Sequence, residues 1–142
     1  MPKRQLYTTL ALAGTLPFAA CALLAVSGLS LPWLKVAPHD IVNAYGLGIL
    51  SFLAGSHWGT YLYRSNESPI NLMIASNLLF LAAWFAFVFA GRSFATATQI
   101  AVFVALLAVD DQLRRGALID SHYFRVRSAA TLVAVLSLSV FL

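Results

Sequence analysis

The sequence predicts an all-α integral membrane protein with five transmembrane helices. Apolar residues make up 61% of the chain, whereas Asp, Glu, Lys and Arg together make up only 10%; a soluble domain contains about 25% charged residues. The apolar residues form five runs, each close to the roughly 20 residues that a helix needs to cross a hydrocarbon core, and the charges lie between them. We therefore expect residues 1–142 to form a single membrane domain, with no room for a soluble catalytic module.

The first expected span covers residues 7–31 and contains Pro17 near its middle. Proline cannot donate a backbone hydrogen bond, so the carbonyl of Ala13 loses its helical partner. Inside a membrane such a gap is tolerated when a neighbouring helix fills it. Two interpretations of Pro17, which we count among the helix-packing residues, are open: a mild kink, or a polar notch that faces the bundle.

The second expected span, residues 40–63, is distinguished by its small residues. Ser51, Gly55 and Gly59 recur at every fourth position, and small residues at this spacing let another helix backbone approach closely. We expect this helix to be the central one, with these three residues as its packing surface. Trp58 is expected to serve packing and lipid contact.

The remaining expected spans cover residues 69–90, 94–115 and 121–142. Pro69 suits the first position of a helix, where its missing N–H is not needed. Gly116 stops the fourth span, and an Asp-Ser pair can cap the start of the fifth. The links between these spans are short, so neighbouring helices are expected to run antiparallel.

Basic residues are distributed unequally between the two sides of this expected topology. The side that carries the N-terminus holds seven of them and the other side holds two. Cytoplasmic segments of membrane proteins carry the excess of Lys and Arg, so the N-terminus is expected in the cytoplasm and the C-terminus outside. Basic side chains at the inner surface also attract anionic lipid. The seven are Lys3, Arg4, Arg64, Arg114, Arg115, Arg125 and Arg127.

His57 is the main candidate for a functional residue because it lies inside the second expected span, about 9 Å from its cytoplasmic end. Ionisable residues within spans are costly and usually face protein or water. His57 could be structural, as a neutral imidazole bonded to a carbonyl or hydroxyl, or functional, as a proton relay, a site for a quinone-like headgroup or a metal ligand. No second ligand lies at a fitting spacing, so a metal site is disfavoured.

Other polar residues are expected near the depth of His57. Asn77 could hold helices together or join a pocket. The last expected span is short after residue 127, so Arg125 or Arg127 is expected at membrane depth, where it could snorkel to the headgroups or pair with Asp110 or Asp111. The charges could form an interfacial belt, or a cytoplasm-facing polar pocket. The candidate pocket residues are His57, Tyr61, Asn77, Asp110, Asp111, Arg125 and Arg127.

Several classes of activity are disfavoured by the sequence. It contains no nucleophile elbow, phosphate-binding loop, metalloprotease motif or paired-cysteine site, and Cys21 is the only cysteine. Basic residues form no continuous stripe, which argues against nucleic-acid binding. We therefore assign no catalytic residue, no cofactor-binding residue and no metal ligand.

The most distinctive motif is the glycine-rich stretch at residues 45–59, YGLGILSFLAGSHWG. Four weaker elements accompany it: GTLPF at residues 14–18, an Ala-Trp pair at 83–84, the aspartate pair at 110–111, and the positions Tyr123, Arg127 and Thr131. Together these segments resemble a family of small membrane proteins of unknown function that includes the mitochondrial transmembrane protein 69. The resemblance covers nearly the whole chain.

The resemblance implies a five-span fold and a location in a bacterial inner (plasma) membrane, or in the mitochondrial inner membrane if the source is eukaryotic. It implies no established activity. It does connect Pro17, His57, Trp58, Arg127 and one of the two aspartates as a single set.

Three functions are compatible with these observations. The leading one is a non-enzymatic membrane protein whose polar pocket around His57 binds or conducts a proton, an ion or a small polar molecule, possibly as an oligomer. The imidazole changes charge near neutral pH, which would make such a pocket pH-sensitive. The alternative is a structural or assembly subunit of a larger membrane complex. The third is a quinone-reactive or other membrane enzyme.

Overall fold

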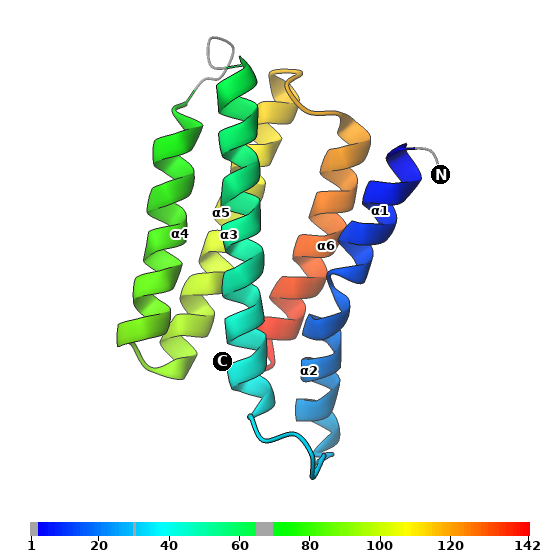
Figure 1. Ribbon diagram of the computed structural model, residues 1–142, viewed down its shortest axis with the longest axis vertical. Helices are drawn as coiled ribbons and strands as arrows, with labels where there is room; N and C mark the ends of the chain where they lie inside the picture. The colour runs from blue at the N-terminus through cyan, green and yellow to red at the C-terminus, as the bar shows by residue number, and fades with distance from the viewer. Residues whose placement is uncertain (1–2, 30, 65–69) are drawn as a thin grey trace.

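The computed structural model describes residues 3–29, 31–64 and 70–142, and its regular structure there is entirely α-helical (Figure 1). Successive long helices run antiparallel to one another, as the short links predict. The helices are α1 (Lys3–Ala13), α2 (Leu16–Ser27), α3 (Pro38–Arg64), α4 (Leu72–Phe89), α5 (Arg92–Arg115) and α6 (Ser121–Ser139).

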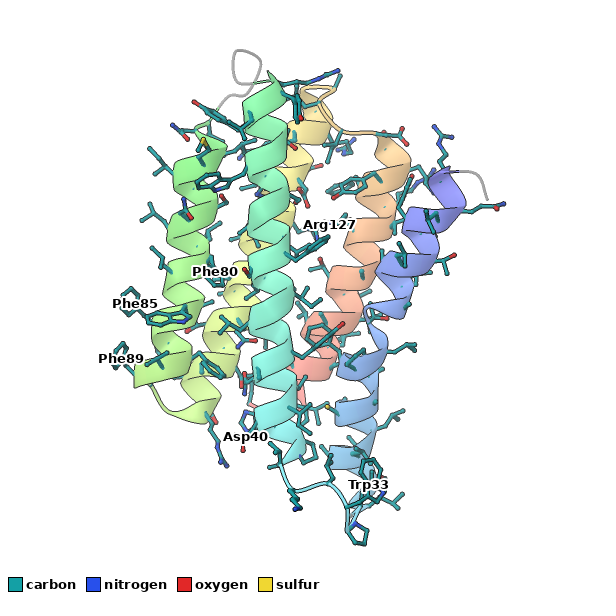
Figure 2. All side chains as sticks on the ribbon, in the orientation of Figure 1. Trp33, Asp40, Phe80, Phe85, Phe89 and Arg127 are labelled. Carbon is teal, nitrogen blue, oxygen red and sulfur yellow. The ribbon has the colours of Figure 1, made fainter. Side chains whose placement is uncertain are left out.

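Three segments of the described chain are both long and apolar enough to cross a membrane: Arg4–Ser27, Leu72–Phe89 and Arg92–Arg115. Large apolar side chains also cover the outside of the bundle. Phe89 is 76% exposed, and Figure 2 shows Phe85 and Phe89 on the outer side of α4. Water would not stabilise such a surface, whereas lipid would, so the bundle is that of an integral membrane protein.

The first apolar segment is broken rather than mildly kinked. The α-helix ends at Ala13 and restarts at Leu16, with Pro17 in the first turn of the second piece. At the break, the Tyr45 hydroxyl of α3 donates a hydrogen bond of 2.8 Å to the carbonyl oxygen of Gly14. The expected polar notch is therefore present, but the carbonyl that a neighbouring helix satisfies is that of Gly14.

Helix α3 lies against α2, α4, α5 and α6 and is the central helix of the bundle. Its small residues do not provide this packing. Ser51 and Gly55 are exposed, and a β-carbon added at Gly55 or Gly59 would contact nothing within 4 Å. The expected packing surface therefore points away from the other helices of the chain.

The buried face of α3 is a different one, and Gly46 is the glycine that it requires. The face consists of Val42, Asn43, Gly46, Leu50, Leu53, Ala54 and His57. A β-carbon at Gly46 would overlap Oε1 of Gln99 from α5 and would also touch Phe18. The position of the buried Gln99 side chain between α3 and α5 thus depends on the absence of a side chain at Gly46.

Candidate functional site

His57 and Asp110 form a buried pair between α3 and α5. The Nε2 atom of His57 lies 2.8 Å from Oδ1 of Asp110, and the two side chains are only 3% and 4% exposed. His57 is placed there by the helical repeat of α3, since Leu50, Leu53 and His57 follow one another on the same buried stripe. A carboxylate can only accept hydrogen bonds, so the proton of this bond belongs to the Nε2 atom of His57.

Arg127 completes the group from α6. Its Nε and Nη2 atoms donate hydrogen bonds of 3.0 and 2.8 Å to Oδ2 of Asp110. Figure 2 shows the Arg127 side chain extending from α6 toward α3 within the bundle. The Asp110 carboxylate thus uses one oxygen for each partner, and its charge is balanced by Arg127. We refer to these three residues as the His57–Asp110–Arg127 cluster.

The other expected pocket residues lie apart from this cluster. Asp111 turns about 100° away from Asp110 around α5 and pairs instead with Arg114 at 2.7 Å and Arg115 at 2.8 Å. Arg125 is exposed. The rotation of each residue about its helix axis therefore decides which charged residues meet: Asp110 rather than Asp111 on α5, and Arg127 rather than Arg125 on α6.

Asn77 and Tyr61 do not join the cluster either. Asn77 is exposed on α4, and the buried polar residue of that helix is Ser76, one position earlier. Tyr61 is half-buried, one turn beyond His57 on α3. Asn77 and Tyr61 are expected near the depth of His57 from their positions along the sequence, but their rotation about the helix axes directs their side chains away from the cluster.

A cavity of about 350 Å³ lies beside the cluster, between α1, α2, α3 and α6. The cavity exists because α1, the part of the first segment before the break at residues 14–15, packs against α6 and lies away from α3 (Figure 1). Leu10 and Phe52, which are 63% and 74% exposed, line its outer part, so it opens to the surface of the bundle. We call it the α1–α3–α6 cavity.

The two ends of this cavity differ in chemistry. The end toward the N-terminus carries Arg127 of the cluster together with Tyr7, Ser56 and Tyr123. The other end, two to three turns away, is lined by apolar residues that include Phe18, Ile49, Phe103 and Ala134. Nothing in the sequence pattern predicts Tyr7 or Ser56 at a site, because the cavity depends on the direction of α1.

A second polar cluster, near the start of α3, was also not foreseen. Asn43 exchanges hydrogen bonds with Thr96 of α5, at 3.0 and 3.1 Å between the side-chain atoms, and the Nε2 atom of His39 lies 2.9 Å from Oγ1 of Thr96. Gln99 donates a bond of 2.9 Å to the carbonyl of Asn43. In the sequence, this cluster is indicated by Thr96 and Gln99, two polar residues that lie three positions apart and therefore on one face of α5.

Apolar side chains separate the two polar clusters. Asn43 and His57 are fourteen residues apart on α3, or about 21 Å of helical rise, and Leu50 and Leu53 lie between them. Phe103 and Leu106 occupy the matching stretch of α5. Among the residues that the structure describes, no three His, Cys, Asp or Glu side chains gather in a way that could hold a metal ion.

Comparison with known proteins gives a consistent result over nearly the whole chain. The family model described as "Protein of unknown function (DUF3429)" matches residues 3–142. Transmembrane protein 69 of Xenopus tropicalis is 35% identical over 141 residues, which cover 96% of this chain and 53% of that protein. Transmembrane protein 69 of Mus musculus is 33% identical over 145 residues, covering 98% and 55%. The chain spans about half the length of these curated relatives, and it matches no solved structure.

Proposed function

This chain belongs to the DUF3429 family of proteins of unknown function, and we propose that it binds a small amphipathic molecule in the α1–α3–α6 cavity. The observation that carries the proposal is the position of Arg127, which lines the cavity and whose guanidinium holds Asp110 of the buried cluster. A ligand whose polar end contacts Arg127 would be linked through Arg127 to Asp110, and through Asp110 to His57.

The proposal includes a topology of five spans with the N-terminus in the cytoplasm, in the inner (plasma) membrane of a bacterium or the mitochondrial inner membrane of a eukaryote. The segment formed by α1 and α2 is one broken span, α4 and α5 are two more, and α3 with 27 residues and α6 with 19, which carry His57 and Arg127, are the remaining two. Arg4, Arg64 and Arg114 lie at the end of the bundle where the chain begins, where they would meet anionic lipid.

Cavity size and lining support a binding role. A volume of about 350 Å³ lies at the lower end of the range of about 300–1,000 Å³ that is usual for small-molecule sites. Such sites combine apolar walls with a few polar groups that fix the orientation of the ligand. Here Ser56, Tyr123 and Arg127 provide the polar end.

Binding is favoured over conduction through the core of the bundle. A path for an ion needs polar groups or water along its length, because an unsolvated charge in an apolar interior is very costly. The stretch between the two polar clusters instead contains fully buried leucines at positions 50 and 106 and the nearly buried Phe103. The interior between α3 and α5 is thus closed between the two polar clusters, and the open space beside the His57–Asp110–Arg127 cluster is the α1–α3–α6 cavity.

Filling the cavity is the direct test of the proposal. Ala130 lines the cavity, whereas its neighbour Ala129 is exposed on the outside of α6. In purified protein in lipid nanodiscs, decanesulfonate or decanol should bind saturably, and Ala130→Phe should weaken binding at least about tenfold. Ala129→Phe adds the same side chain outside the cavity and should leave binding unchanged. Absence of saturable binding by both probes, or an equal loss in both variants, would contradict the proposal.

One observation favours a second candidate function, that of a subunit in a larger membrane assembly or a homo-oligomer. Ser51, Gly55 and Gly59 form an outward stripe of small residues on α3, which is the kind of surface on which membrane helices associate. Native mass measurement of the solubilised particle separates the two cases: a single chain argues against assembly, and further copies or co-purifying subunits support it.

A further inference from the structure

We propose that the ligand of the α1–α3–α6 cavity is a single-chain amphiphile with a negatively charged head, and that its head binds together with a proton taken up by His57. This inference rests on the proposed binding function and names the class of ligand. The head would lie at Arg127, and the chain would follow the apolar wall toward Phe18 and Phe103.

The first support is a charged donor with unused capacity. Arginine carries five N–H groups, and Arg127 commits its Nε and Nη2 atoms to Asp110. Its Nη1 atom makes no hydrogen bond to any residue in the described ranges. The side chain is only 9% exposed, and the cavity is the space that it lines. Oxygen atoms of an anionic head match such a donor in both charge and geometry.

The second support is the character of the groups around Arg127. Tyr7, Ser56 and Tyr123 line the same end of the cavity, and the Ser56 hydroxyl donates a hydrogen bond of 2.7 Å to the carbonyl oxygen of Leu53. No acidic side chain lines the cavity within the described part of the chain. Within the Asp110–Arg127 pair, Arg127 is the member that lines the cavity and Asp110 lies behind it. An anionic head would therefore meet the positive member of the pair first, whereas a cationic head would meet a charge of its own sign.

The third support is the charge balance of the cluster. With His57 neutral, Asp110 and Arg127 cancel and the cluster is neutral. A proton on His57 would leave one uncompensated positive charge in a buried site, which is costly. An anion at Arg127 removes that cost, so anion binding and proton binding favour each other, and by linkage the effect is reciprocal.

Few other ionisable groups can offset this balance. Asp110 faces His57 from α5, Arg127 lies on α6, and Tyr61 is on α3 itself. Tyr123 of α6 and Tyr7 of α1 line the cavity, and the Tyr7 ring packs edge-to-face on His122 of α6, which lies 3.3 Å from the Thr8 hydroxyl. Helix α4 carries no ionisable side chain between Leu72 and Phe89. The sign of the pH effect follows: because a proton is taken up with the anion, affinity for the anion should fall as pH rises.

The test compares decanesulfonate, which stays charged across this pH range, with decanol and decyltrimethylammonium of equal chain length. Decanesulfonate should bind at least about tenfold more tightly than decanol, and the cation should bind most weakly. Calorimetric titration in buffers of different ionisation enthalpy should show net proton uptake with decanesulfonate and none with decanol. Equal affinities for decanesulfonate and decanol would contradict a preference for an anionic head. If both ligands then lost affinity in Ala130→Phe, the proposed binding function itself would still stand.

His57→Gln tests the second half of the inference. Glutamine keeps a side-chain N–H that can bond to Asp110 but cannot take up a proton near neutral pH. Proton uptake and the pH dependence of decanesulfonate affinity should both disappear in this variant. His39→Gln, in the other polar cluster, should preserve them. Tight anion binding without proton uptake in the unmodified protein would overturn the coupling, and this measurement needs no variant to fold.

Discussion

Replacing Asp110 by asparagine is expected to lower the free energy of unfolding by about 3–5 kcal/mol, because it leaves the Arg127 guanidinium buried without its counter-charge. Asparagine also turns one of the two acceptor oxygens into an NH2 group, so one of the two donors, on His57 or Arg127, would face another donor. The measurement is equilibrium unfolding in detergent micelles, followed by circular dichroism.

The neighbouring acid supplies a matched control. Asp111→Asn makes the same chemical change, but Asp111 pairs with Arg114 and Arg115 at the surface of α5, where such pairs contribute about 1 kcal/mol or less. Adding Arg127→Gln to Asp110→Asn removes the orphaned charge and should recover part of the loss. Equal destabilisation by Asp110→Asn and Asp111→Asn would refute the buried cluster.

Gly46→Ala is the second substitution with a large expected effect. Gln99 is fully buried, and its Oε1 atom has no hydrogen-bond partner among the described residues. A β-carbon at Gly46 would overlap that oxygen. A methyl group there would push Gln99 off its bond to the Asn43 carbonyl. We expect a loss of about 1–3 kcal/mol, as for other overpacked cores.

Gly48→Ala isolates the packing effect from helix propensity. Gly48 lies two positions further along α3, and a β-carbon there would contact nothing within 4 Å. The same substitution should therefore be neutral, or stabilising by up to about 1 kcal/mol, because alanine is the better helix former. A thermal unfolding series in detergent that ranks Gly46→Ala equal to Gly48→Ala would contradict the packing of the Gln99 side chain against Gly46.

The helices and the membrane setting could be predicted because they depend on local properties of the chain. Runs of apolar residues and the charges between them define helical segments without reference to other segments. The depth of His57 followed from its distance along α3. Which of the two acids contacts His57 could not be predicted. Asp110 and Asp111 differ only in their rotation about α5, and that rotation is determined by how α5 packs against α3 and α6.

The role of the glycines could not be predicted for a similar reason. Small residues at every fourth position identify a surface for close approach, but not whether another helix of the same chain covers it. The stripe at Ser51, Gly55 and Gly59 lies outside, and Gly46 has the packing role because Gln99 comes from a helix far along the sequence. The cavity depends on the break after Ala13, a long-range outcome of how α1 packs on α6.

The central claim, that an amphiphile occupies the α1–α3–α6 cavity with its head at Arg127, is tested most directly by photocrosslinking in nanodiscs. The probe is decanesulfonate with a diazirine in its chain, and labelled peptides are mapped by mass spectrometry. We predict labels on α2 near Phe18 and on α6 near Ala134, removed by excess decanesulfonate. Labels confined to the outer face of α4 around Trp84 and Phe85, or labels that excess decanesulfonate does not remove, would contradict the account.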